Sequence, residues 1–292
     1  MALKKKARPR LLSSTRPRNI KPTPSLSSHA TRTLVRSHHT LRKQLSCALA
    51  QGDDFKAESI KYEIEAAGGL RKYQEASIQG QSAERGGDTS KVLLQWLLEV
   101  KGLELVRNAS GKKFRMLEVG ALRTDNTCSR NGAFEMKRID LHSQHSDIEE
   151  QDFMELPFPA TEDLDQEGFD IVSLSLVVNF VGDPAQRGEM LKRVEGFLRP
   201  CSRDGDEMSE FFPTLFLVLP APCVTNSRYL DEEKLKSILE ILGYTMAKRK
   251  LSSKLVYYLW RYEGSVKKNS KVFKKEEIRS GRSRNNFAIV LR

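Results

Sequence analysis

Between residues 113 and 262, short apolar runs alternate with helical patterns, and this alternation constrains the fold more than any other feature. The apolar runs that are strand-like in length are FRMLEVG (114–120), FEMKRIDL (134–141), FDIVSLS (169–175) and TLFLVLP (214–220). Amphipathic helices are predicted at 184–198 and 230–242. Continuously apolar strands that alternate with helices predict an open, doubly wound α/β sheet that is mostly parallel and covered on both faces. Runs at 244–251 and 255–261 predict an antiparallel hairpin at one edge.

The charge is distributed unevenly along the chain. Residues 1–50 contain twelve Lys and Arg and no Asp or Glu, and residues 261–292 contain ten Lys and Arg against three Glu. The intervening residues carry 27 Lys and Arg against 35 Asp and Glu, so the net charge of +11 comes from the two ends. Basic ends on a mildly acidic body are typical of arms that bind a polyanion.

These patterns predict four segments. Four prolines in the first 24 residues predict a disordered basic tail over 1–40. A helical lead-in over 41–108 precedes an α/β domain over 109–262, and a basic extension follows over 263–292. The run KKKARPR at 4–10 fits a nuclear localisation signal. The alternatives are a solvated tail without a targeting signal and a mitochondrial presequence. The prolines and the lysine triplet count against the presequence.

Membrane, disulfide and metal functions find no support in the sequence. No stretch approaches the roughly 20 apolar residues of a membrane-spanning helix. The four cysteines have no paired short spacing, and the five histidines show no ligand spacing. We therefore expect neither a disulfide scaffold nor a metal site.

Polar residues stand at three predicted strand ends, where an open α/β sheet binds its ligands. Glu118 and Gly120 end the first strand, and Asp140 ends the second, at a spacing suited to a ribose diol. Asp152 and Phe153 follow, and we expect them to bind and cover an adenine. Singly, each feature also fits an ordinary turn, helix cap or surface loop. Their order within one βαβ frame favours a nucleoside site.

The residues after Gly120 distinguish between cofactors. They read ALRTDN, so the glycine-rich G-x-G-x-x-G motif is absent. A pyrophosphate needs several glycines for close backbone approach, so NAD and FAD are disfavoured. S-adenosylmethionine, a nucleoside with an amino-acid end and no phosphate, fits better.

These motifs resemble the class I S-adenosylmethionine-dependent methyltransferases, and more narrowly the fungal 25S rRNA adenine-N(1)-methyltransferase family. The resemblance covers roughly residues 60–262, and its most specific stretches lie at 80–91, 178–180 and 226–229. It implies a Rossmann-like sheet in which Gly120 and Asp140 bind S-adenosylmethionine. Glu118, Asp152 and Phe153 join the cofactor site by the same resemblance.

The sequence departs from one pattern of related enzymes. Methyltransferases that act on exocyclic amines often carry Asp/Asn-Pro-Pro-aromatic after the fourth strand, and here that place reads SLSLVVNF (173–180). Adenine N1 has an in-plane lone pair, so the enzyme mainly has to position the base. We expect Asn179 to hold the base and Phe180 to stack on it as the catalytic residues. Helix packing is the alternative for Phe180.

Two further groups are candidates for the substrate side. Arg85 and Asp88 lie in a loop before a predicted helix, where they would close over the methionyl carboxylate or an RNA phosphate. Helix capping is the alternative role for Asp88. Asn226, Arg228 and Tyr229 follow the strand at 214–220, at a position that can line the substrate side.

The resemblance implies an enzyme that methylates N1 of an adenine in large-subunit (25S) rRNA. Its partner would be that rRNA or a pre-ribosomal particle, in the nucleus and nucleolus. A non-enzymatic S-adenosylmethionine sensor that acts through a protein partner is the alternative, and a methyltransferase for a small molecule or a protein is a third. The basic ends favour the rRNA enzyme, because a metabolite sensor does not need them.

Overall fold

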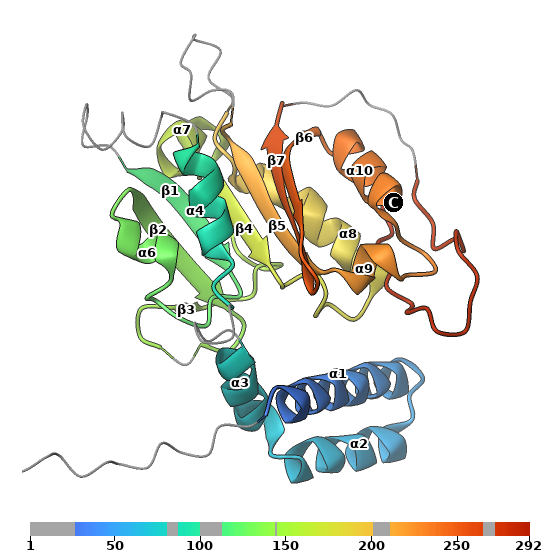
Figure 1. Ribbon diagram of the computed structural model, residues 1–292. Coiled ribbons are helices and arrows are strands. Elements are labelled where there is room, and N and C mark those ends of the chain that lie inside the picture. Colours follow the sequence, from blue (N-terminus) through green and yellow to red (C-terminus); the bar gives the residue numbers. More distant parts are fainter. Residues whose placement is uncertain (1–26, 81–86, 100–112, 144, 201–210, 265–271) are drawn as a thin grey trace, which may run out of the picture.

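The described residues fold around a mixed sheet of seven strands in the order β3-β2-β1-β4-β5-β7-β6 (Figure 1). The computed structural model describes residues 27–80, 87–99, 113–143, 145–200, 211–264 and 272–292. The parallel strands are β1 (Phe114–Val119), β2 (Phe134–Asp140), β3 (Glu149–Glu150), β4 (Ile171–Ser175) and β5 (Thr214–Pro220). The antiparallel strands β6 (Tyr244–Leu251) and β7 (Leu255–Tyr262) complete one edge. The predicted mostly parallel sheet with a C-terminal hairpin is confirmed.

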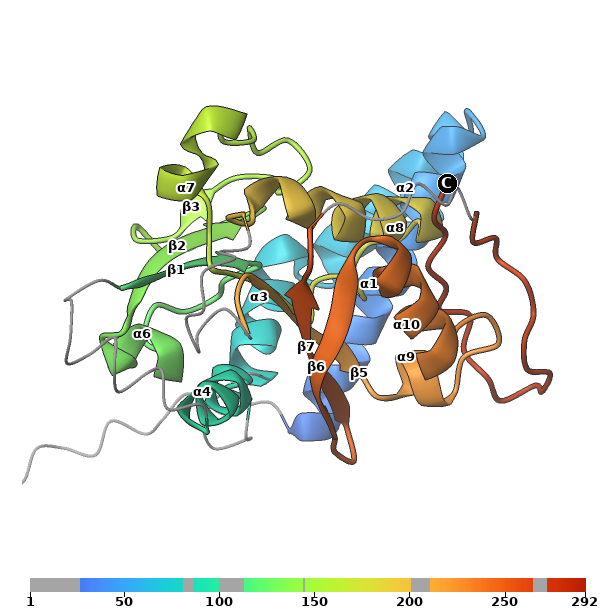
Figure 2. The same cartoon turned by 90° about the horizontal axis from the view of Figure 1, so that it is seen from above.

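Helices cover both faces of the sheet. On one face, α8 (Pro184–Arg193) and α10 (Glu232–Ile241) pack into the larger apolar core. On the other, α4 (Ser90–Leu98) and α6 (Thr127–Asn131) pack into a second core that includes Trp96. Figure 2 shows α4 and α8 on opposite sides of the strands. This arrangement requires strands that are apolar on both faces, and six of the seven residues of β5 are buried.

The helices begin where the sequence supplies a cap. The Asp183 side chain accepts a hydrogen bond from the N–H of Ala185, and Pro184 occupies the first turn of α8, where it needs no donor. Asp231 caps α10 through the N–H of Lys234. A 3₁₀ turn, Val194–Phe197, continues from α8 and completes the helix expected at 184–198. The remaining short helices are Thr161–Asp163, α7 (Leu164–Glu167) and α9 (Pro222–Thr225).

Three N-terminal helices lie beyond the carboxyl ends of the parallel strands (Figure 1). They are α1 (Ser28–Ala50), α2 (Asp54–Ala66) and α3 (Gly69–Gly80). The boundary expected at residue 40 is therefore wrong, because α1 already begins at Ser28. All four prolines of the tail precede that point, and the Ser27 hydroxyl caps the helix through the N–H of Ala30. Residues 1–26, with the expected localisation signal, lie outside the described residues.

The described part of the C-terminal extension, residues 272–292, is folded onto the body. Its apolar side chains are buried, namely those of Phe273, Phe287, Ala288, Ile289 and Leu291. Arg187 of α8 donates a hydrogen bond to the carbonyl of Ala288 at 2.7 Å. A Cβ atom at Gly188 would lie 1.9 Å from the Val290 carbonyl oxygen, so the segment passes directly over the backbone of α8. The expectation of a basic arm does not hold for these residues, because their apolar side chains complete the larger core.

Candidate functional site

A cavity of about 630 Å³ lies between the carboxyl ends of the parallel strands and the N-terminal helices. The strand-end wall includes Gly120, Asp140, Asp152 and Phe180. The helical wall comes from α1 and α3 and consists of His38, Arg42, Leu70, Tyr73, Gln74 and Ser77. The cavity therefore occupies the place where an open α/β sheet binds its ligands.

Gly120 follows β1 and closes against the turn after β4. Its φ of +72° lies in the left-handed region, and an added Cβ would meet Cγ2 of Val177 at 2.7 Å. Only glycine satisfies both conditions. Its N–H donates to the Ile139 carbonyl at 2.8 Å, which places the bare backbone at the cavity wall.

Asp140 is the last residue of β2 and lines the cavity. One carboxylate oxygen accepts a hydrogen bond from the N–H of His142 at 2.9 Å, which holds the side chain at the strand end. Burial raises the pKa of Asp140, and the bond from His142 opposes this rise. A partly buried carboxylate held at this edge is placed to accept hydrogen bonds from a polar ligand.

Asp152 and Phe153 lie side by side in the chain but have different surroundings. Asp152 lines the cavity, and its carboxylate accepts a hydrogen bond from the N–H of Met154 at 2.8 Å. Phe153 is 3% exposed, and its ring centroid lies 5.3 Å from that of Phe197 in the larger core. Phe153 borders the cavity, but most of its ring supports the wall rather than covering an open adenine site.

Glu118 borders a smaller neighbouring hollow instead of the cavity. Both of its carboxylate oxygens accept hydrogen bonds from the Asn126 amide at 2.9 Å, and Arg138 lies 3.9 Å away. Burial raises the pKa of Glu118 to about 7, against the opposing effects of Asn126 and Arg138. The structure places Glu118 beside the cavity rather than in its lining, and cofactor binding by Glu118 stays a prediction.

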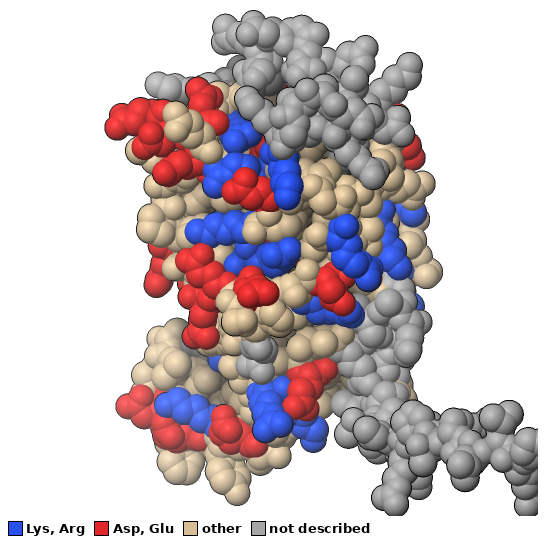
Figure 3. All heavy atoms as spheres, turned by 90° about the vertical axis from the view of Figure 1, so that its left-hand side faces the viewer, with Lys and Arg blue, Asp and Glu red and all other residues tan. Residues whose placement is uncertain are grey.

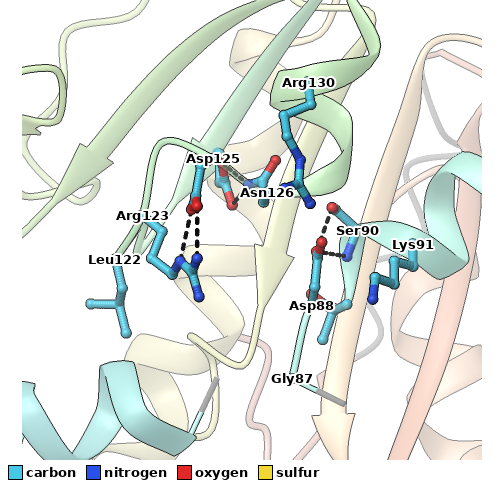
Figure 4. A pocket seen from close by; sticks show the side chains of 11 residues that line it. Gly87, Asp88, Ser90, Lys91, Leu122, Arg123, Asp125, Asn126 and Arg130 are labelled. Atoms are coloured by element: carbon cyan, nitrogen blue, oxygen red, sulfur yellow. Dashed lines mark hydrogen bonds and ion pairs between the residues drawn. The ribbon is translucent and has the colours of Figure 1, made fainter. Parts of the chain in front are cut away.

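Asp88 stands in the same hollow, beside Ser90 (Figure 4), and its hydrogen bonds join two helices. Its carboxylate accepts hydrogen bonds from the N–H and hydroxyl of Ser90, at the start of α4. It also accepts from the N–H and hydroxyl of Thr127, at the start of α6. Burial acts to raise the pKa of Asp88, but these hydrogen bonds outweigh it and lower the pKa. The capping role is thus the one the structure shows for Asp88, and Arg85 lies outside the described residues.

The turn after β4 carries the two predicted catalytic residues. Leu176 has a φ of +60°, the one positive φ at a non-glycine position in the described part of the chain. Such strained backbone is typical of functional turns. The Phe180 side chain lines the cavity and remains 39% exposed. The Asn179 amide oxygen is buried, with no hydrogen-bond partner among the described residues, and Asn179 does not line the cavity.

The N-terminal helices contribute residues that sequence reasoning missed. The rings of His38 and Tyr73 stack with centroids 4.4 Å apart, and Tyr73 meets Phe180 edge-on at 6.4 Å. Gln74 donates a hydrogen bond to the His142 carbonyl at 2.6 Å, which ties α3 to the end of β2. Burial, and then the charge of Arg42, lower the pKa of His38. Tyr73 lies in a stretch of sequence that resembles the family, but no sequence pattern predicted His38 as a site residue.

The predicted group Asn226, Arg228 and Tyr229 does not line the cavity. Arg228 donates hydrogen bonds to the Asn286 side chain and to the Gly281 carbonyl, both at 2.8 Å. Asn226 donates to the Ser283 carbonyl, and the Tyr229 ring lies 4.7 Å from the Lys275 ammonium group. These residues anchor the C-terminal segment instead, and their substrate-side role stays a prediction.

The described residues include neither a cluster of metal ligands nor a helix that could span a membrane. No group of three His, Cys, Asp or Glu side chains in the described ranges is arranged to hold a metal ion. No helix within those ranges has the length and apolar character needed to cross a membrane.

Acidic and basic side chains are interspersed on the face of the molecule that carries β2 and β3 (Figure 3). Several are ion pairs, such as Lys137 with Glu149 at 3.3 Å and Arg123 with Asp125 at 2.7 Å. This face therefore presents no single basic field. The excess positive charge of the chain lies in its terminal segments.

Comparison with known proteins identifies one family. Residues 58–289 match the family described as 25S rRNA (adenine(2142)-N(1))-methyltransferase, Bmt2. The chain is 38% identical to a Schizosaccharomyces pombe protein named 25S rRNA adenine-N(1) methyltransferase, over 88% of this chain and 89% of the relative. It is also 38% identical to the Saccharomyces cerevisiae 25S rRNA (adenine(2142)-N(1))-methyltransferase, over 80% of this chain and 63% of that relative.

Solved structures are more distant. An rRNA methylase from Escherichia coli is 12% identical with a TM-score of 0.39, covering 80% of this chain and all of the other. A phosphoethanolamine N-methyltransferase from Haemonchus contortus, solved with S-adenosylhomocysteine, is 9% identical with a TM-score of 0.36, covering 56% of this chain and 52% of the other. The family relationship therefore rests on the sequence relatives.

Proposed function

Because this chain belongs to the family of 25S rRNA (adenine(2142)-N(1))-methyltransferases, we propose that its cavity transfers a methyl group from S-adenosylmethionine to N1 of an adenine in large-subunit rRNA. The observation that carries the proposal is the family match over 58–289, which includes the strand ends that line the cavity. Family membership rests on sequence similarity, and the cavity shows how the matching residues are arranged in space.

The residues of the strand-end wall fit S-adenosylmethionine. Gly120 presents backbone where a side chain would block a ligand, and Asp140 is placed to accept hydrogen bonds from the ribose hydroxyls. Asp152 and Glu155 add two further carboxylates to the lining. Their negative charge suits a ligand that carries a sulfonium and an ammonium group.

The turn after β4 positions the acceptor base. Phe180 offers an exposed ring in the cavity, on which an extruded adenine stacks. Asn179 precedes Phe180 but does not line the cavity; its buried amide oxygen, which has no hydrogen-bond partner among the described residues, stays the candidate acceptor for the exocyclic amino group of adenine.

The chemistry needs little from the protein beyond positioning. When bound, the sulfonium supplies an activated methyl group. The N1 lone pair forms the new bond, the carbon–sulfur bond breaks, and the positive charge moves from sulfur to the base. Holding the two reactants in line removes much of the entropic barrier. We propose that the carboxylates that line the cavity stabilise the positive charge that develops on the base.

We propose that the protein meets its substrate in the nucleus and nucleolus, either as free rRNA or within a pre-ribosomal particle. The basic run at 4–10 and the excess of twelve Lys and Arg in residues 1–50 support this proposal. The alternative of a non-enzymatic sensor has no observation in its favour, because both sequence relatives carry the names of enzymes.

The proposal is tested in fission-yeast cells that lack the 38% identical relative. An N1-methyl group blocks the Watson–Crick edge, so reverse transcriptase stops at the modified adenine. We expect this chain to restore a stop in large-subunit rRNA, and Asn179→Ala to abolish it while protein level and S-adenosylmethionine binding persist. An rRNA without any stop that depends on this chain would overturn the proposal.

A further inference from the structure

One cation stands in the cavity, on the wall made by the N-terminal helices. Arg42 is the one Lys or Arg among the lining residues that the structure describes, and it is exposed on α1. The carboxylates of the lining, Asp140, Asp152 and Glu155, come from the strand-end side. The cavity therefore has an acidic wall suited to the cofactor and a second wall with the opposite charge.

The cation of this second wall stands beside aromatic rings. Arg42 follows His38 by four residues, so the two side chains share one face of α1, about 6 Å apart along the helix axis. The His38 ring stacks on the Tyr73 ring, and the Tyr73 ring packs against the Phe180 ring in a T-shaped, edge-to-face arrangement. A guanidinium group and an array of rings thus border the same space.

The charge of Arg42 is not neutralised within the described part of the chain. Ion pairs do occur on the neighbouring helices, where Lys61 pairs with Glu58 and Arg71 with Glu75. No carboxylate of the described residues pairs with Arg42, and the 23 residues of α1 include no Asp or Glu. The Arg42 guanidinium group is therefore available to pair with an anionic group of a ligand.

We propose that Arg42 binds a backbone phosphate of the RNA next to the adenine that stacks on Phe180, so that the helical wall is the RNA subsite of the cavity. This inference rests on the proposed function. Proteins bind single strands through a cation for the backbone and rings for the bases. The planar fork of an arginine matches phosphate geometry, and Arg42 is exposed, as a contact to a solvated RNA backbone requires.

The carboxylate of the cofactor is the competing anion. Two features favour the phosphate. Arg42 belongs to the helical wall, whereas Gly120 and Asp140, the residues that fit the cofactor, belong to the strand-end wall. In addition, the neighbouring His38 is buried with a lowered pKa, so Arg42 acts as a single cation beside neutral rings at neutral pH.

The test uses the full-length protein and protein-free large-subunit rRNA from fission-yeast cells that lack the relative. Three variants are compared with the wild type, namely Arg42→Gln, Arg42→Lys and Lys43→Gln. Lys43 is the matched control because it is the next residue on α1, carries the same charge and lines a separate hollow between α1 and α2. Methyl transfer is measured against rRNA concentration at several salt concentrations, and S-adenosylmethionine affinity is measured by calorimetry.

Arg42→Gln should raise the KM for rRNA about tenfold, because a charge-assisted hydrogen bond is lost. It should also lower the slope of log(kcat/KM) against log salt by about 0.7, the value for one phosphate contact on a single strand. Arg42→Lys should recover the slope and part of the KM, since lysine keeps the charge without the fork. Lys43→Gln should stay within about twofold of the wild type, and all variants should bind S-adenosylmethionine as the wild type does.

Three results would overturn the inference while leaving the proposed function intact, provided that the wild type methylates the rRNA. The first is an unchanged KM and salt slope in Arg42→Gln. The second is a rise in KM in Lys43→Gln equal to that in Arg42→Gln, which would show that total charge matters rather than a specific site. The third is a weakened S-adenosylmethionine affinity in Arg42→Gln, which would assign Arg42 to the methionyl carboxylate. A wild-type protein that transfers no methyl group to the rRNA would overturn the proposed function, and the inference with it.

Discussion

Individual side chains at the cavity wall separate cofactor binding from acceptor binding. Asp140 projects from the end of β2, and Phe180 follows β4 on a turn that begins at the strained Leu176. Both line one cavity, although they come from different strands. Substitutions at the two positions should therefore affect different measurements.

Asp140→Ala should weaken S-adenosylmethionine binding by about 2 kcal/mol, because it removes a charge-assisted acceptor for the ribose hydroxyls. Calorimetry measures this loss directly. Asp147→Ala, which removes an exposed carboxylate from the loop after β2, is the control and should bind as the wild type does. Wild-type affinity in Asp140→Ala would refute the ribose assignment.

Phe180→Ala should lower kcat/KM for rRNA methylation by a factor that corresponds to about 1–3 kcal/mol, since a stacking platform is lost. S-adenosylmethionine affinity should be nearly unchanged. The ring is 39% exposed, so the melting temperature should also hold. Phe55→Ala on α2, where the side chain is 89% exposed, controls for the loss of a surface ring. A large fall in the melting temperature of Phe180→Ala would reassign the residue to packing.

Glu118 should make stability depend on pH. Its pKa is about 7 in the folded protein and about 4.5 in the unfolded chain. The folded state therefore retains a proton that the unfolded chain releases, and the stability from protonated Glu118 is lost as the pH rises from 4.5 to 7. The loss should be on the order of 3 kcal/mol. Denaturant titrations should show it in the wild type and in Glu167→Gln, an exposed control, and not in Glu118→Gln.

A wild-type protein and a Glu118→Gln variant with parallel stability profiles between pH 4.5 and 7 would contradict this assignment. The comparison is sharp because glutamine resembles the protonated acid in shape. It still meets Asn126 and Arg138 but cannot titrate.

Among the secondary-structure elements, α8 carries the contact that holds the C-terminal segment. Its Gly188 lies under the Val290 carbonyl, and its Arg187 lies over the Phe287 ring at 4.3 Å. The segment contributes apolar side chains to the larger core, including Ile289. The stability of the α/β body therefore depends on residues that follow its last strand.

Gly188→Ala should destabilise the protein by about 1–3 kcal/mol, because the new methyl group would overlap the backbone of residue 290. Thermal unfolding measures the loss, and tryptic cleavage within 272–292 should accelerate as the segment detaches. Gly182→Ala is the control, since a Cβ atom there meets nothing within 4 Å. An unchanged melting temperature and cleavage rate in Gly188→Ala would show that the segment does not pack as described.

At the scale of the whole molecule, sequence reasoning succeeded where burial is local and periodic. Most residues of the strands β1, β4 and β5 are buried, so their apolar runs and the polar residues at their ends were recognisable. The helical wall and the packing of the C-terminal segment were missed because they depend on contacts across long stretches of chain. Gln74 of the wall bonds to a carbonyl 68 residues away, and Arg187 of α8 bonds to a carbonyl of the C-terminal segment 101 residues away. Local patterns do not contain such contacts.

Deletion of residues 1–26 tests the role of the basic tail. The cut lies before the cap at Ser27, so the fold and S-adenosylmethionine affinity should be retained. Nuclear accumulation should fall, and the salt dependence of RNA binding should flatten, because the segment carries eight Lys and Arg. Microscopy and binding titrations measure these effects. If the truncated protein still accumulates in the nucleolus and binds RNA with the same salt slope, the localisation signal and the RNA contacts lie outside residues 1–26.

The central claim is that this chain methylates N1 of an adenine in large-subunit rRNA. Its most direct test is the transfer of an isotope-labelled methyl group from S-adenosylmethionine to rRNA from fission-yeast cells that lack the relative. The rRNA is then digested and its nucleosides are separated by chromatography and mass spectrometry. We predict that the label appears as 1-methyladenosine in large-subunit rRNA, and that Asp140→Ala reduces it. Label in N6-methyladenosine, or no label in rRNA, would contradict the account.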